Sequence, residues 1–182
     1  MRQYSKQQAG IVLVVSLIVM LLLTLIGTTA VHTATLEEKI AGNTRNRDLA
    51  FQAAESALLA GESYVGSLET TAFNCKNGLF KARDINCDGT QEAIDIWENP
   101  AIWSDNSQSI AYIADKNTPP STDLAQRSAY PRYIIEIINT VCTTPARPCP
   151  IADQQKNYRV TARATGSSVD SVVMLQSIYS LL

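Results

Sequence analysis

Histidine is almost absent from this chain of 182 residues, which contains His32 and no other. A Ser-His-Asp or Cys-His catalytic arrangement needs an imidazole beside the nucleophile. His32 directly follows a long apolar run, so we expect it at a membrane surface and away from any folded domain. No pair of carboxylates has a spacing that singles out an acid and a base. The sequence therefore predicts a protein that is not an enzyme.

Positive charge is also scarce, with 15 Lys and Arg against 17 Asp and Glu, and a formal net charge of −2. Arg2 and Lys6 both precede Gly10, so the rest of the chain carries −4, the total of −2 less these two positive charges. Proteins that bind nucleic acids need a basic patch for the phosphates, and the sequence has no basic stripe. We therefore exclude nucleic-acid binding.

No Cys-x-x-Cys motif occurs, and with a single histidine this excludes the usual zinc ligand sets. The four cysteines form two local pairs, Cys75 with Cys87 and Cys142 with Cys149, all after the apolar run. Local, even-numbered cysteines in an exported domain usually form disulfides. We therefore predict the disulfides Cys75–Cys87 and Cys142–Cys149, and an oxidising compartment such as a bacterial periplasm.

A hydrophobic run without any charge occupies residues 10–31. A helix of about 20 apolar residues crosses a bilayer core and satisfies its own backbone groups there. The leader, residues 1–10, is basic and has no acid, and basic flanks stay cytoplasmic. We predict a transmembrane segment over 11–31, with the N-terminus in the cytoplasm and the bulk of the chain exported. A signal peptide cleaved near Ala30 and an uncleaved single-pass anchor are the alternatives.

The apolar run leads, without a proline, into a second helical stretch over 32–66. Its apolar residues recur at helical spacing and form a stripe suited to packing on a folded domain. The stripe consists of Ala50, Ala53, Ala57 and Tyr64, with Phe51, Ala54, Leu58 and Val65 beside them. Gly66 and Ser67 then favour the end of the helix.

The remaining residues, 67–182, suffice for one modest domain. Apolar and polar residues alternate over 158–165, as in a strand with one buried face. Further strands are expected over 109–114, 133–138 and 169–179, the last apolar enough to be central. A short helix over 91–98 should end at Asn99 and Pro100, and 118–128 should be an exposed loop. The pattern predicts an α+β fold in which an antiparallel sheet packs on the helix.

The segment Asp84-Ile85-Asn86-Cys87-Asp88-Gly89 matches the first half of an EF-hand loop. Calcium takes six to eight oxygen ligands. In an EF-hand loop the spacing of these residues directs their oxygen atoms toward a single point, where the ion binds. The candidate calcium ligands are Asp84, Asn86, Asp88, Thr90, Glu92 and Asp95. Asp95 stands where a longer glutamate is usual, and no good helix precedes the loop. The alternative is a polar turn beside a disulfide, bent at Asp88-Gly89. Calcium is thus the only cofactor that the sequence suggests.

The basic leader that ends in Gly10, followed at once by the apolar helix, resembles the class III signal of type IV pilins. Residues 35–62 are similar to the N-terminal region of PilX-type minor pilins, most specifically at EKIAGN, 38–43, and AFQAAE, 50–55. The late segment YRVTARATG, 158–166, resembles the same group. The resemblance implies the ladle fold of type IV pilins, in which a long N-terminal helix packs on an antiparallel β-sheet head.

The resemblance also implies processing at the membrane. A prepilin peptidase would cleave after Gly10, and the new N-terminus, Ile11, would be methylated. Most pilins carry a glutamate as the fifth residue after the cleavage point, and that carboxylate is thought to pair with the N-terminal amine of a neighbouring subunit. Here the residue is Val15. PilX-type pilins and the K-type pseudopilins of type II secretion commonly lack the glutamate as well.

A PilX-type minor pilin is expected in the complex that primes a type IV pilus and caps its tip. It would be a single-pass inner-membrane protein before assembly and would lie at the pilus tip, on the cell surface, afterwards. The implied partners are other minor pilins, the major pilin, the prepilin peptidase and a tip adhesin. The alternatives are an adhesin or adhesin carrier acting through loops 70–106 and 118–128, a K-type pseudopilin, and a plain membrane-anchored periplasmic protein.

Overall fold

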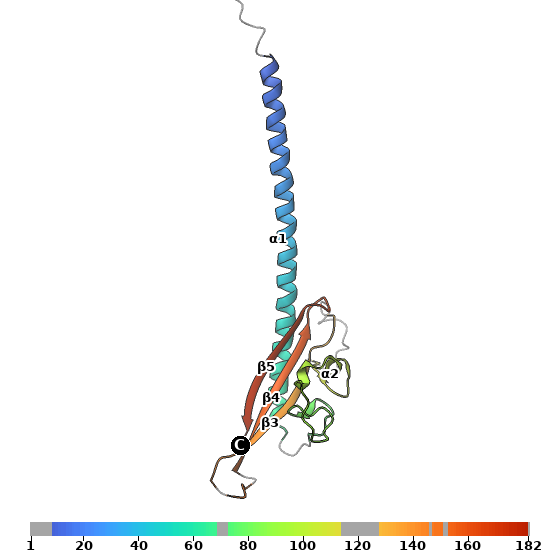
Figure 1. Cartoon of the computed structure of the whole chain (residues 1–182), viewed down its shortest axis with the longest axis vertical. Coiled ribbons are helices and arrows are strands. Elements are labelled where there is room, and N and C mark those ends of the chain that lie inside the picture. The colour runs from blue at the N-terminus through green and yellow to red at the C-terminus, as the bar shows by residue number, and fades with distance from the viewer. Residues whose placement is uncertain (1–8, 69–72, 114–127, 146, 151–152, 182) are drawn as a thin grey trace, which may run out of the picture. The chain divides into compact units, whose positions relative to one another are not determined.

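The structure is a computed structural model that describes residues 9–68, 73–113, 128–145, 147–150 and 153–181 (Figure 1). The start of the leader and most of the loop expected over 118–128 lie outside these ranges. The chain divides into two compact units, Met1–Thr44 and Arg45–Leu182. The long helix α1, Ala9–Val65, runs through the boundary between them.

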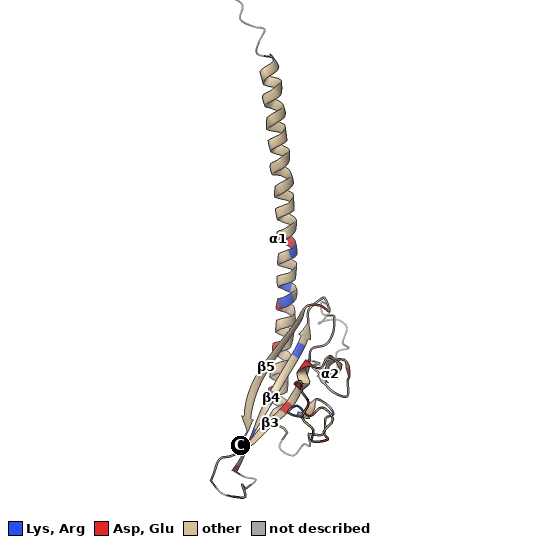
Figure 2. Cartoon of the chain, viewed as in Figure 1, with Lys and Arg blue, Asp and Glu red and all other residues tan. Residues whose placement is uncertain are grey.

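The first unit is described by its part of α1. Its apolar side chains face outward, as at Leu13, which is 67 % exposed, and Leu23, which is 62 % exposed. The helix is long and apolar enough to cross a membrane, and the first half of α1 carries no charged residue (Figure 2). Hydroxyl groups within it donate to backbone carbonyls of the preceding turn, as Thr24 does to Leu21 at 2.8 Å. These polar groups are therefore satisfied without water, as a lipid environment requires.

The second unit contains a five-stranded sheet. Three long strands form an antiparallel meander, and two short strands pair with the first of them. The long strands are β3, Arg132–Cys142, β4, Gln154–Thr165, and β5, Val172–Leu181. The short ones are β1, Leu79–Lys81, parallel to β3, and β2, Ile110–Ala111, antiparallel to it. The expected α+β fold with an antiparallel sheet is confirmed, and the short parallel strand β1 is an addition to it.

The position of β5 differs from the prediction. The strand order is β1-β3-β4-β5, so β5 is an edge strand and not a central one (Figure 1). The apolar residues of β5 have another explanation, since Val173 and Leu175 pack against the cluster formed by Ala53 and Ala54 of α1 and Ala164 of β4. Strand order depends on which strands pair at long range, and the composition of one strand does not specify this.

The part of α1 from Arg45 onward packs on one face of the sheet through small residues. Ala50, Ala53, Ala54 and Ala57 are completely buried. A Cβ added at Gly61 would lie 2.5 Å from Val160 Cγ1, so the helix comes too close to β4 for any larger residue.

Contacts at two positions of α1 show its direction relative to β4. Asn46 Oδ1 accepts hydrogen bonds from Ser167 N and Ser167 Oγ just beyond the end of β4, whereas Gly61 faces Val160 within it. The helix therefore runs opposite to β4 and in the same direction as β5. Two members of the predicted stripe, Phe51 and Tyr64, lie at its margin and remain 46 % and 36 % exposed.

The segment 73–113 covers the other face of the sheet. Its apolar side chains form a second core with Ile134 of β3, namely Cys75, Phe80, Ile96, Ile102 and Trp103. The segment contains a 3-10 helix, Ile96–Glu98, and the helix α2, Pro100–Ser104.

The helix predicted over 91–98 and its end at Pro100 are wrong. Asn99 is the N-cap of α2, and its Oδ1 accepts a hydrogen bond from Ala101 N at 3.0 Å. Pro100 occupies the first turn, where its missing N–H costs nothing and its fixed φ suits a helix. The Asn-Pro pair therefore begins a helix here.

Candidate functional site

The predicted processing site lies at the start of α1. Gly10 is exposed, with no atom outside the helix backbone within 4 Å of where its Cβ would be. Ile11 and Val15 follow in the helix and are 68 % and 52 % exposed. All three residues are thus open to another molecule.

A shallow hollow lies farther along the same helix, where Gly27 leaves space between larger neighbours. It is lined by Thr24, Gly27, Thr28, Val31 and His32. Small residues on a membrane helix let a second helix approach closely. This surface therefore suits contact with another helix and offers no enclosed chamber for a substrate.

The first disulfide, Cys75–Cys87, closes a loop that contains the candidate calcium ligands Asp84 and Asn86, and the other candidates follow Cys87. Asp84 is buried, and its carboxylate accepts hydrogen bonds from Asp88 N and Gly89 N, both at 3.1 Å. Asp88 Oδ1 in turn accepts from Thr90 N at 2.8 Å. Both carboxylates therefore serve the backbone of the turn that ends at Gly89, which has a φ of +86°.

The remaining candidate ligands are not gathered around Asp84. Asp95 Oδ1 lies 3.8 Å from Arg83 Nε and 3.6 Å from Arg159 Nη2, Glu92 N donates to Arg83 O, and Asn86 is exposed. Among the described residues, no three His, Cys, Asp or Glu side chains are grouped so as to hold a metal ion. These contacts give the calcium hypothesis no support and are those of the polar turn that we gave as the alternative, and calcium binding stays a prediction.

A buried ion pair on the same face was not predicted. Glu136 is completely buried, and its two carboxylate oxygens accept hydrogen bonds from Arg159 Nε and Nη2 at 2.9 and 3.0 Å. Asp95, at 3.6 Å from Arg159, extends the pair to the segment over the sheet. Burial raises the pKa of Glu136, and the hydrogen bonds from Arg159 offset this only in part. The network therefore ties β3 and β4 to the loop that carries the first disulfide.

A sequence signal for this pair does exist. Glu136 is the only charge within the apolar run YIIEII, 133–138, and Arg159 follows Tyr158 in the other clearly alternating strand. The covering segment 73–113 has no strong periodicity of its own, so the sequence did not indicate that Glu136 would be covered. Only the tertiary structure shows that the segment 73–113 covers Glu136 and that its carboxylate is buried.

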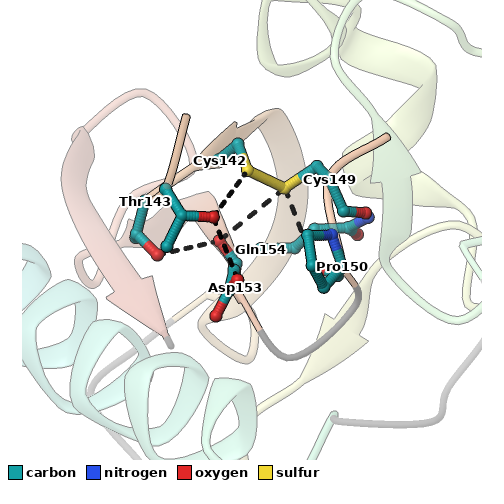
Figure 3. The surroundings of a disulfide bond; sticks show 7 residues. Cys142, Thr143, Cys149, Pro150, Asp153 and Gln154 are labelled. Atoms are coloured by element: carbon teal, nitrogen blue, oxygen red, sulfur yellow. Dashed lines mark hydrogen bonds between the residues drawn. A yellow bond between two sulfur atoms is a disulfide. The ribbon is translucent and has the colours of Figure 1, made fainter. Parts of the chain in front are cut away.

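The second disulfide, Cys142–Cys149, links the end of β3 to the turn before β4 (Figure 3). Thr143 N and Thr143 Oγ1 donate to Asp153 O at 2.9 and 3.0 Å. Thr144 Oγ1 donates to Asp153 Oδ2 at 3.0 Å. The turn is therefore held by side chains on both of its arms as well as by the disulfide.

The chain thus combines an apolar helix, a sheet that packs on the second half of this helix, and disulfide-closed loops, and two family models match it. The family model "PilX N-terminal" matches residues 9–59. The family model "Type IV pilus assembly protein PilX C-term" matches residues 44–181. The chain belongs to the PilX family. This PilX-family protein is a minor pilin of the type IV pilus assembly system, as its resemblance implied. Searches of curated proteins and of solved structures found no match.

Proposed function

We propose that this minor pilin joins the complex that starts a type IV pilus and then stays at the pilus tip. The observation that supports the proposal is Val15, the fifth residue after Gly10, in a run of α1 without any charge. Most pilins have a glutamate there, thought to pair with the N-terminal amine of a neighbouring subunit.

The polarity of the filament gives Val15 a physical meaning. A helical filament is a head-to-tail stack and needs a first member. If the glutamate of each added subunit reaches the amine of the subunit already above it, the first subunit has no such amine to reach. An unpaired carboxylate inside the bilayer would cost about 2.5 kcal/mol or more. Valine at this position therefore suits the first subunit and disfavours addition to a growing shaft.

The same proposal includes the path to the tip. The leader 1–10 is removed after Gly10 by a prepilin peptidase, and Ile11 is methylated. Residues 11–31 hold the protein in the inner membrane, and residues 32–66 and 67–182 form the exported helix and head in the periplasm. The protein acts there by contact with other minor pilins and the major pilin, and not as an enzyme.

The test is to count this protein per filament and to locate it by gold labelling. Wild-type pili should carry very few copies, at the tip, and deletion of the gene should reduce the number of pili. Val15→Glu should place copies along the shaft. Val14→Glu is the matched control, because it adds the same carboxylate to the neighbouring position, which points in another direction around the helix.

Three results would contradict the proposal or its physical basis. Many wild-type copies spread along the shaft would remove the tip assignment, whatever the variants do. Normal pilus numbers in the deletion strain would remove the role in initiation. Equal shaft incorporation of Val14→Glu and Val15→Glu would show that the position of the carboxylate is unimportant.

A further inference from the structure

The edge strand β5 presents a long unpaired backbone. It pairs with β4 from Val172 to Leu181, and no strand of the described chain pairs with its other side. In an antiparallel strand alternate residues point their N–H and C=O groups outward, so about five residues of β5 offer both groups at this edge. Such a row of groups is a template for one further strand.

β5 has none of the features that usually protect a sheet edge. It is ten residues long, and its sequence VVMLQSIYSL contains no charged residue and no proline. Its register with β4 is continuous, whereas β3 has an irregularity between Ile137 and Asn139. Natural edges are normally blunted by lysine, proline, bulges or short length. An edge that lacks all of these is suited to pairing.

The side chains beside this edge indicate the chemistry of the partner. On the face away from the helix, Ile178 is 71 % exposed and Val172 is 42 % exposed. Arg163 of β4 lies on the same face, opposite Met174 of β5 and Arg132 of β3. Its guanidinium makes no hydrogen bond or ion pair with any described residue, and burial lowers its pKa. The site thus combines apolar contacts with a half-buried cation that has no anion as its partner among the described residues.

We propose that the free edge of β5 binds an extended segment of another pilus subunit as an additional strand. That segment is apolar at alternate positions, to cover Val172 and Ile178, and carries an acidic side chain near Met174 that pairs with Arg163. This proposal deepens the proposed function by naming a contact surface, and it rests on the protein acting within a pilus complex.

A second copy of this chain does not fit the edge. The helix segment from Arg45 to Val65 runs in the same direction as β5, because both run opposite to β4. Antiparallel pairing of two β5 edges would therefore point the two helices in opposite directions. Subunits of one filament share a single polarity, which excludes this antiparallel arrangement. Parallel pairing of two β5 edges would keep the polarity but needs a two-fold axis between identical surfaces, which a head-to-tail helical stack does not contain. The occupant is therefore a segment of a different subunit.

Photo-crosslinking from the edge in pilus-producing cells tests this. A photoreactive amino acid, p-benzoylphenylalanine, replaces Ile178 in the full-length protein. The matched control places it at Val169, which is 67 % exposed but lies in the turn before β5. We expect an adduct with one other pilus subunit from position 178, mapped by mass spectrometry to an extended apolar segment with an acidic residue, and at least tenfold less from position 169. Adding Arg163→Glu should reduce the adduct several-fold.

Three outcomes overturn the proposal: no adduct from position 178 in cells that make pili, an adduct with a second copy of this chain, or equal adducts from both positions. Circular dichroism of each variant checks that the head is folded. The same photoreactive amino acid at Ser180, which lies on the same strand, should reproduce the adduct. Failure here is distinct from failure of the proposed function. Normal piliation after gene deletion defeats the role in initiation, whereas a missing adduct in piliated cells defeats only the β5 contact.

Discussion

Replacement of Arg159 by methionine tests the buried ion pair directly. Methionine keeps the apolar length of the side chain but leaves the carboxylate of Glu136 buried without its two hydrogen bonds. Breaking a buried pair in this way typically costs 3–5 kcal/mol. The side chain of Arg159 is 20 % exposed, so water can partly reach the site. We therefore expect Arg159→Met to lower the free energy of unfolding by about 3 kcal/mol near neutral pH.

The loss should depend on pH in a defined direction. Removing the guanidinium raises the pKa of Glu136 beyond the increase that burial already causes. A glutamate in the unfolded chain binds its proton only below about pH 4.3. Between that value and the raised folded-state pKa, the folded state binds more protons, so stability falls as pH rises, by up to about 1.4 kcal/mol per pH unit. The decrease in the free energy of unfolding caused by Arg159→Met should therefore be smaller at pH 5 than at pH 7.5.

The assay is urea unfolding of the full-length protein in detergent. Its signal is the fluorescence of Trp97 and Trp103, which pack in the core on the same face as the pair. Arg163→Met is the matched control, because Arg163 lies on the same strand and face and has no described acidic partner. Adding Glu136→Gln to Arg159→Met should recover most of the loss, since it removes the stranded charge.

A decrease in the unfolding free energy of Arg159→Met below about 1 kcal/mol at pH 7.5 would refute this prediction, because an ordinary exposed ion pair contributes no more than that. The prediction is also refuted by an equal loss at pH 5 and pH 7.5, or by an equal loss in Arg163→Met. Any of these results would mean that Glu136 is not confined as a buried charge.

Three further predictions concern processing, oxidation and the loop at Asp84. Mass spectrometry of membrane-extracted protein should find methylated Ile11 at the N-terminus, and Gly10→Val should block it; an intact leader in the wild type would contradict this. Non-reducing peptide mapping of periplasmic protein should recover only the two local cysteine pairs, and crossed pairs or free thiols would count against the prediction. Asp84→Ala should lower the unfolding free energy by about 2 kcal/mol, because two backbone N–H groups lose their acceptor. Millimolar calcium should leave the melting temperature of the wild type unchanged, and a calcium-dependent increase that Asp84→Ala abolishes would restore the calcium hypothesis.

Features that depend on local chemistry could be read from the sequence. The uncharged run 10–31 specifies a helix of membrane length because each residue adds a fixed rise and no charge interrupts it. The small residues Ala50, Ala53 and Ala57 mark the helix face that packs on the sheet, and the alternation over 158–165 marks a strand with one buried face. The cysteine pairs joined in the structure are separated by 12 and 7 residues, so local spacing sufficed to suggest them.

Features that depend on long-range packing were decided only by the tertiary structure. The composition of β5 suggested a central strand, but its place at the edge follows from which strands pair. Glu136 is a single charge in an otherwise apolar strand, and only the fold of the segment 73–113 over its face makes it a buried charge that needs Arg159. Asp84 has the spacing of a calcium ligand, but its carboxylate is taken up by two amides of its own turn. In each case the residue type allows two environments, and the free energy of burial or pairing with distant segments selects one of them.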